Sequence, residues 1–208
     1  MNEISMPSEW IATTVNNFWG NTARHDHTMQ IYENDDILAD TLTGLMQGIF
    51  NSNENVLLIA THQHLNALES RLEKLGYKID ELINNDRFVP FDAEEMIDEC
   101  MIDDEFNETV FAERCSSLIK RATDNKKTFM TCGEIAPILL TQGKREAAIK
   151  LEQLSDKMCS IHHSGLFCIY SKDHLENAYV HEAICSCHVK LVSGADKQLT
   201  EVFYKTIR

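Results

Sequence analysis

Apolar residues recur along the chain in two alternating patterns, short unbroken runs and stripes with helical spacing. The run 56–60 (VLLIA) is fully apolar, which is typical of a central parallel strand covered on both faces. The stripe after Asp35 and Asp36 repeats about every 3.6 residues and predicts a helix capped by one of these carboxylates. The alternation of strands and helices predicts a three-layer α/β fold, in which helices cover both faces of a mostly parallel sheet.

The same patterns divide the rest of the chain. The expected strands are 28–32, 56–60, 88–91, 128–132, 166–170 and 188–192. The expected helices carry apolar stripes over 37–49, 65–75, 111–122, 135–140, 147–158 and 175–184, and Gly76 stands where a helix C-terminal cap belongs. We expect an amino-terminal extension over 1–24 and a single domain over 25–208. Trp10, Phe18 and Trp19 are expected to pack on this domain or on a partner.

Composition narrows the classes of partner. The chain has 208 residues and a formal net charge of −14, which opposes binding to nucleic acid and to anionic membranes. No stretch approaches the ~20 apolar residues that span a bilayer. The first residues lack a basic region followed by an apolar run, so we expect a cytoplasmic protein. Seven cysteines, an odd number, then indicate reduced and mostly buried thiols, and the methionines on the apolar stripes are expected in the core.

Polar residues follow the predicted strands at their carboxyl ends, where open α/β sheets bind ligands. This candidate ligand-binding set comprises Tyr32, Thr61, His62, Asp92, Gly133, Glu134 and Tyr170. The alternative for Thr61 and Asp92 is structural, since both are good helix N-caps. Several such residues in one crevice favour a binding function.

Signatures of catalysis are weak. The segment after 56–60 lacks the glycines and the lysine of a phosphate-binding loop, so ATP hydrolysis of the usual kind is not expected. Asp92 and Glu134 remain an alternative acid–base pair for an enzyme. The acidic run 98–108 is expected to be a solvated surface.

Three short segments contain histidine or cysteine residues that could bind a metal ion. They are His25-Asp26-His27, His162-His163 and Cys185-Ser186-Cys187-His188. Zinc needs about four ligands, and the clearest pair is Cys185 with His188, which share a face if they lie on one helix. A metal- or redox-responsive protein using His27, Cys185, Cys187 and His188 is therefore the alternative. The sequence favours buried thiols and hydrogen-bonded histidines without a bound cofactor over this alternative.

Several short motifs occur in an order that resembles the MEDS domain, the sensory domain of methanogen and methylotroph regulators. They are HTMQIYE (27–33), ENVLLIAT (54–61), FDAEE (91–95), GEI (133–135), LEQL (151–154), FCIY (167–170) and CSCH (185–188). Two positions depart from the pattern, because Ser155 stands in place of a Trp and Ser171 in place of a Pro.

The resemblance implies a RecA/KaiC-like fold without a phosphate-binding loop, and a role in signalling and transcription regulation through the sensing of small molecules such as hydrocarbon derivatives. It implies no catalysis. Its motif positions are His27, Tyr32, Thr61, Asp92, Gly133, Glu134, Tyr170, Cys185 and His188. We therefore expect a non-enzymatic sensory domain that binds a small organic molecule at the strand ends, where His27 joins the candidate ligand-binding set, and that signals through a protein partner; a homodimer is left open.

Overall fold

A mixed sheet of eight strands forms the centre of the protein. The computed structural model describes residues 10–13, 26–123, 128–162, 164–188, 190–195 and 198–205. The strands are β1 (Trp10–Thr13), β2 (His27–Tyr32), β3 (Asn55–Ala60), β4 (Phe88–Asp92), β7 (Phe129–Gly133), β8 (Gly165–Ser171), β9 (Lys190–Ala195) and β10 (Gln198–Lys205). Their order in the sheet is β1-β10-β9-β2-β8-β7-β3-β4.

Every pairing from β9 to β4 is parallel, so the sheet is mostly parallel as the sequence predicts. Two antiparallel strands extend one edge: β10 pairs with β9, and β1 pairs with β10. The backbone of Trp10–Thr13, within the expected amino-terminal extension, is therefore part of the sheet. Phe18 and Trp19 lie outside the described residues.

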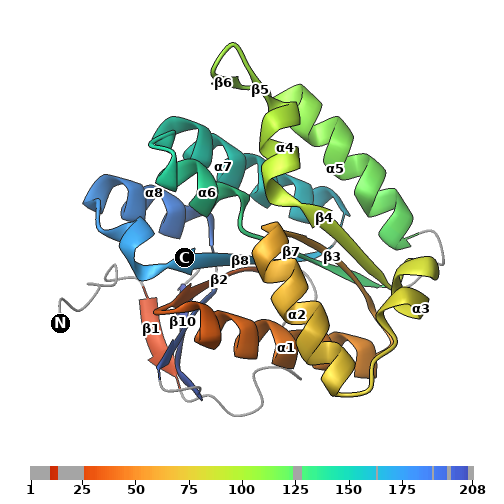
Figure 1. Cartoon of the computed structure of the whole chain (residues 1–208). Helices are drawn as coiled ribbons and strands as arrows, with labels where there is room; N and C mark the ends of the chain where they lie inside the picture. Colours follow the sequence, from red (N-terminus) through yellow and green to blue (C-terminus); the bar gives the residue numbers. More distant parts are fainter. Residues whose placement is uncertain are drawn as a thin grey trace.

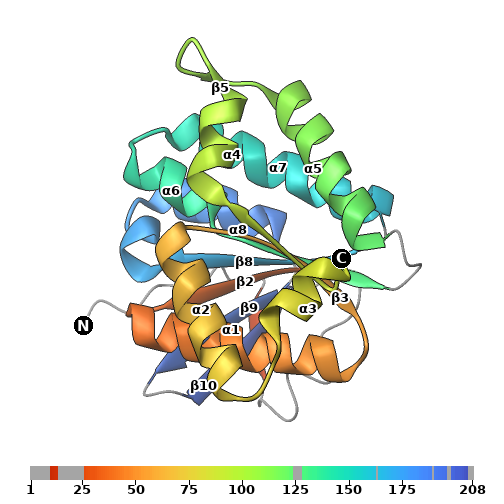
Figure 2. The ribbon, with the colours of Figure 1, turned by 45° about the vertical axis from the view of Figure 1, so that its right-hand side comes forward.

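Helices cover both faces of the sheet (Figures 1 and 2). One face carries α1 (Asp35–Asn51), α2 (His62–Lys74) and α3 (Ile79–Asn84). The opposite face carries α4 (Ala93–Cys100), α5 (Glu108–Thr123), α6 (Ile135–Thr141), α7 (Arg145–His162) and α8 (Ala178–Cys187). A short 3₁₀ helix (Lys172–Leu175) precedes α8, and the hairpin β5 (Met101–Ile102) and β6 (Glu105–Phe106) follows α4.

Two apolar cores separate the sheet from its two helical layers. Successive side chains of a strand point to opposite faces. In β8, Phe167 and Ile169 therefore enter the core beneath α1 and α2, whereas Cys168 and Tyr170 enter the core beneath α4–α8. This alternation decides which of the predicted site residues can meet.

Some local expectations differ from the structure. The last strand of the parallel set begins at Lys190, and His188 instead ends α8 as its C-cap. Leu75 is 53% exposed because α2 ends there, although the apolar stripe placed it in the core. Gly76 does adopt a left-handed conformation at φ +91°, as expected of a C-terminal cap.

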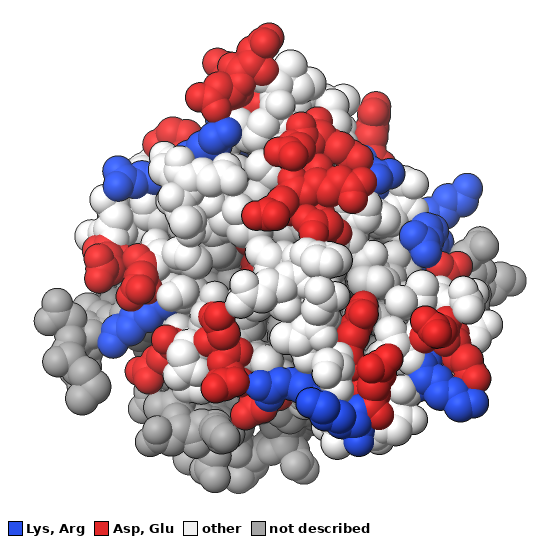
Figure 3. Space-filling model, viewed as in Figure 1, with Lys and Arg blue, Asp and Glu red and all other residues white. Residues whose placement is uncertain are grey.

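The acidic run is a solvated surface, as predicted. Its residues form the outer side of α4 and the β5–β6 hairpin, whose tip places Asp103 and Asp104 at positive φ. Figure 3 shows acidic side chains gathered over this part of the molecule. The exposed carboxylates of α4 are Glu94, Glu95, Asp98 and Glu99. Membrane insertion through a helix finds no support, since none of the described helices combines the length and apolarity that a span requires.

Candidate functional site

Two of the strand-end residues meet at the carboxyl edge of the sheet. Glu134, buried at the end of β7, accepts hydrogen bonds from the backbone N–H of Thr61 and from His64 Nδ1 at 2.8 Å. Thr61 itself caps α2 by accepting from the His64 backbone N–H at 3.3 Å. The hydrogen bond to Glu134 outweighs the opposing effect of burial and raises the pKa of His64. These groups satisfy one another and join the starts of α2 and α6.

Other members of the predicted set surround this pair with separate structural roles. The pKa of Tyr32 is raised to about 12, first by burial and then by the negative charge of Glu134. Asp92 accepts from two backbone N–H groups of α4 and is its N-cap, the structural alternative given above. His62 is exposed in the first turn of α2. Gly133 adopts ordinary strand geometry, with room for a methyl group 3.6 Å from the Ile59 carbonyl oxygen.

Tyr170 and His27 do not join the strand-end residues. Both point into the core beneath α7 and α8, since alternation along β2 and β8 sends Tyr32 to the opposite face. The sequence predicts one shared crevice, and the structure instead brings these two residues to a separate polar group. Their helical contact is Glu152 of α7.

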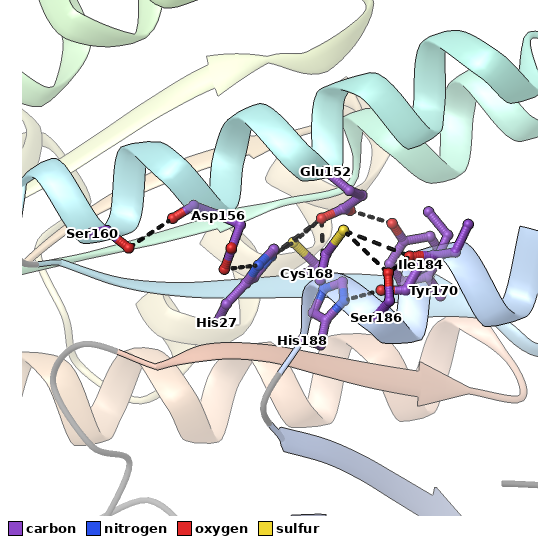
Figure 4. A network of polar contacts seen from close by, with 11 residues as sticks. His27, Glu152, Asp156, Ser160, Cys168, Tyr170, Ile184, Ser186 and His188 are labelled. Carbon is purple, nitrogen blue, oxygen red and sulfur yellow. Dashed lines mark hydrogen bonds and ion pairs between the residues drawn. The ribbon is translucent and has the colours of Figure 1, made fainter. Parts of the chain in front are cut away.

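Four side chains with metal-binding chemistry meet in this second place, which we call the buried cluster. Its members are His27, Glu152, Cys168 and His188. One ligand atom from each lies within 4.8 Å of all the others, and no member is more than 5% exposed. Figure 4 shows Glu152 reaching from α7 toward His27 and Cys168 of the sheet, with His188 beside them.

Contacts outside the buried cluster orient three of its members. His188 Nδ1 lies 2.7 Å from the Ile184 carbonyl oxygen, which can only accept, so Nδ1 carries the proton and Nε2 presents a lone pair. His27 Nδ1 faces the Asp156 carboxylate at 3.4 Å, and in this orientation of the ring Nε2 faces the cluster. Tyr170 donates its hydroxyl hydrogen to Glu152 Oε1.

The charges within the buried cluster are coupled. Burial opposes a charged His27, but the neighbouring carboxylates of Asp156 and Glu152 outweigh it and raise the pKa of His27 to about 9. Burial likewise opposes ionisation of Glu152, yet the surrounding imidazoles and Tyr170 lower its pKa to about 2. Burial and the neighbouring His27 charge lower the pKa of His188 to about 4. At neutral pH the cluster therefore contains an ion pair of His27 and Glu152 beside a neutral His188.

The structure changes the composition of the alternative metal set. Among the described residues His27 and His188 come together, but the cysteines that the sequence joined to them, Cys185 and Cys187, are not within the cluster. The shared-face argument fails because α8 ends at Cys187 and His188 is extended. His25 and His163 lie outside the described residues. Sequence reasoning missed Glu152 and Cys168 as candidates; the available signal was a glutamate on the apolar stripe of 147–158.

A largely apolar cavity adjoins the buried cluster. It lies between the sheet strands β3, β7 and β8 and the helices α5, α6 and α7, and has a volume of about 60 Å³. Most of its wall is aliphatic or aromatic, with Leu57, Phe111 and Leu151 among the lining residues. Glu152 and Cys168 belong to both the cavity wall and the buried cluster. Ser155, where the resemblance expects a Trp, also lines the cavity.

Comparison with protein families gives an identification that agrees with the motif order. Residues 26–188 match the family described as MEDS, the methanogen/methylotroph DcmR sensory domain. The chain belongs to the MEDS family. The matched range runs from β2 through α8 and ends at His188, so it contains all four members of the buried cluster. Membership supports a sensory role. No curated protein matches the chain.

Solved structures share the fold of this MEDS domain at low sequence identity. A structural-project protein from Pyrococcus horikoshii OT3 is 10% identical with a TM-score of 0.57, and 92% of each chain is covered. The flagellar accessory protein FlaH from Methanocaldococcus jannaschii is 9% identical with a TM-score of 0.50, covering 87% of this chain and 77% of its own. The predicted three-layer α/β fold with a mostly parallel sheet is confirmed, and these solved structures share it.

Proposed function

We propose that this MEDS domain senses a small, mostly apolar organic molecule held in the cavity between the sheet and α5–α7, without catalysing a reaction. The observation that carries the proposal is the cavity itself, an apolar space inside a domain of a sensory family. The strand-end residues favoured by sequence are less suited to a ligand, since Thr61, His64 and Glu134 already satisfy one another.

The size of the cavity limits the ligand. One water-sized sphere needs roughly 10–15 Å³ of such space, so about 60 Å³ favours a molecule of a few non-hydrogen atoms. Very small ligands gain at most about 1.5 kcal/mol per non-hydrogen atom, so we expect dissociation constants in the micromolar range or weaker. Such an affinity suits a sensor of an abundant metabolite.

A few polar groups would orient the molecule. Thr131 and Ser155 contribute hydroxyl groups to the wall, and Glu152 contributes a carboxylate. Ligand pockets generally combine an apolar wall with a small number of such groups, which select among molecules of similar size. A small alcohol, thiol or halogenated hydrocarbon fits this pattern better than a sugar or a nucleotide.

The signal would pass to a protein partner through the helices that cover the cavity. Helix α4 packs on α5 and α6, both of which line the cavity, and its outer side is acidic. A ligand can shift the packing of α5 and α6 only if it binds one arrangement of these helices more tightly than another. Because α4 packs on both helices, such a shift would change the position of α4. We therefore favour a partner with a basic surface that contacts α4.

Thermal unfolding in the presence of small organic molecules tests the ligand proposal. A ligand that binds only the native state raises the midpoint, with about 2.7 kcal/mol of stabilisation at one hundred times its dissociation constant. Candidates should include short alcohols, thiols and halogenated hydrocarbons at millimolar concentration. The expected result is a concentration-dependent rise for molecules of a few non-hydrogen atoms and none for their larger homologues.

A variant that fills the cavity tests where the ligand binds, and the same substitution on the surface provides the matched control. Ser155→Leu places an aliphatic side chain in the cavity and should abolish the ligand-dependent rise. Ser116→Leu makes the same substitution at an exposed position of α5 and should leave the rise intact. Equal responses of the two variants, or binding of large and small homologues alike, would place the ligand elsewhere.

A further inference from the structure

We propose that the buried cluster is a transition-metal site that holds one Zn²⁺ ion through two imidazole nitrogens, one thiolate and one carboxylate oxygen. The ligand atoms are His27 Nε2, His188 Nε2, Cys168 Sγ and an oxygen of Glu152. This proposal rests on other observations than the organic ligand, although Glu152 and Cys168 belong to both the buried cluster and the cavity wall.

The separations between the donor atoms fit a tetrahedral ion. In tetrahedral coordination, Zn–N, Zn–O and Zn–S bonds of about 2.0–2.3 Å place neighbouring donor atoms roughly 3.3–3.6 Å apart. The Glu152 Oε2 atom lies 3.2 Å from His27 Nε2, 3.6 Å from His188 Nε2 and 3.6 Å from Cys168 Sγ. His27 Nε2 lies 3.3 Å from Cys168 Sγ. Four of the distances between donor atoms are therefore already close to those of a tetrahedral zinc site.

One of these donors has an unmet bonding requirement. His188 is fully buried, its Nδ1 is committed to the Ile184 carbonyl, and its Nε2 has no hydrogen-bond partner among the described residues. A buried polar atom without a partner is costly. This nitrogen lies 3.6 Å from Glu152 Oε2, and a metal ion bound by both atoms would satisfy it.

The surroundings have the features of a metal site beyond its ligands. Metal-bound histidines usually donate their other ring N–H to a carboxylate or a backbone carbonyl. His27 has Asp156 in this position and His188 has the Ile184 carbonyl, while Tyr170 fixes the remaining oxygen of Glu152. These contacts turn the donor atoms inward, and the contact of His188 with the Ile184 carbonyl holds the ring tautomer that can bind metal through Nε2.

Charge balance also favours a divalent ion. Zinc binding releases two protons, one from His27 Nε2 and one from the thiol of Cys168, and one thiolate and one carboxylate then balance the two positive charges of Zn²⁺. The loaded site is then neutral, which lowers the cost of burying it. The mixture of imidazole, thiolate and carboxylate suits zinc, whereas Mg²⁺ and Ca²⁺ prefer oxygen donors alone.

The test measures the metal content of the full chain and then identifies the residues that bind the metal. Protein purified from zinc-supplemented cells should contain one equivalent of zinc by elemental analysis. Protein stripped with a chelator and titrated with Co²⁺ should show the strong visible bands of tetrahedral coordination and a thiolate-to-cobalt charge-transfer band, both saturating at one equivalent. Added Zn²⁺ should displace the cobalt and raise the unfolding temperature of the stripped protein.

Matched variants assign the donors. Cys168→Ser retains the size of the side chain and should remove the charge-transfer band. Cys187→Ser, at a cysteine of the sequence-derived metal set, should retain one metal and the full spectrum. His188→Ala should weaken Zn²⁺ binding by at least about 100-fold, and His188→Asn provides a second variant if the alanine form does not fold.

Three results would overturn the proposal. The first is wild-type protein that is folded but binds neither Zn²⁺ nor Co²⁺ at stoichiometric levels. The second is an octahedral cobalt spectrum without the charge-transfer band. The third is loss of the band in Cys187→Ser but not in Cys168→Ser. None of these results bears on the cavity, so failure of the metal site is distinguishable from failure of the proposed ligand.

Discussion

Tyr170 donates its hydroxyl hydrogen to one oxygen of Glu152, so the other oxygen, Oε2, faces the two histidines of the buried cluster. The contact joins the sheet to α7 across a completely buried interface. It gives Tyr170, which the sequence placed in a ligand crevice, a role in positioning Glu152.

Removal of this hydroxyl should weaken the metal site more than the fold. In Tyr170→Phe, Glu152 keeps its charge but loses a fixed orientation, and loss of such an outer contact typically costs 10–100-fold in metal affinity. We expect a decrease of about this size in competition titrations of Zn²⁺ against a coloured chelator. Tyr32→Phe, on the opposite face of the sheet, should change the affinity little. Equal losses in both variants would assign the effect to general destabilisation.

An enlarged cavity should distinguish a ligand pocket from a packing defect. Leu151→Ala removes a buried side chain from the cavity wall and should lower the free energy of unfolding by about 2–5 kcal/mol. Leu68→Ala makes the same change in the opposite core and should cost a similar amount. Only the Leu151 variant should regain stability with organic molecules too large for the wild type. Denaturant unfolding with and without these molecules provides the measurement.

Two glycines with different backbone conformations should respond differently to alanine. Gly76 ends α2 at φ +91°, and left-handed geometry costs an L-residue roughly 1–2 kcal/mol, so Gly76→Ala should destabilise by that amount. Gly133→Ala adds only an ordinary contact and should be neutral or stabilise by up to about 1 kcal/mol. Because Gly133 also lines the cavity, its variant should lower ligand affinity without loss of stability. Reduced stability together with unchanged affinity would contradict the cavity proposal.

Stability should depend on pH through His64. Its folded-state pKa is raised by the hydrogen bond to Glu134, so the protonated form contributes stability that is fully present below pH about 6.5 and is lost as pH rises through the folded value. Asp35, at 3.9 Å, adds to the same effect. The stability difference between wild type and His64→Gln should therefore shrink at alkaline pH. Denaturant titrations of both proteins across this pH range provide the measurement.

The layers of the fold follow from local patterns. The all-apolar run of β3 and the stripes of α1 and α2 predict a covered parallel sheet, and the structure places these elements as expected. The predicted cap of α1 was wrong, because Asn34 accepts the hydrogen bond from the Ile37 backbone N–H, and Asp35 and Asp36 lie in the first turn. The edge strands β10 and β1 were not predicted: β10 forms a hairpin with the neighbouring β9, and β1 pairs with β10 from the opposite end of the chain. Helix α4 was missed because its exposed acidic side dominates a short sequence.

The buried cluster could be predicted only in part. His27 and His188 attracted attention as metal-binding residue types, but the partners they find depend on long-range packing. Glu152 comes from the middle of α7 and Cys168 from a strand whose register with β2 brings it beside His27. Periodicity identifies the buried face of each element and contains no information on which buried faces meet.

The four proposed donors are contributed by separate parts of the chain, and the last of them, His188, precedes β9, which pairs directly with the β2 strand that carries His27. During synthesis on the ribosome, His27 emerges first and the other three donors follow late in the chain, with His188 last. A chain halted ahead of His188 would hold an incomplete coordination sphere, and tight capture of the ion would await nearly the full length of the domain. Metal uptake would then mark the completion of folding.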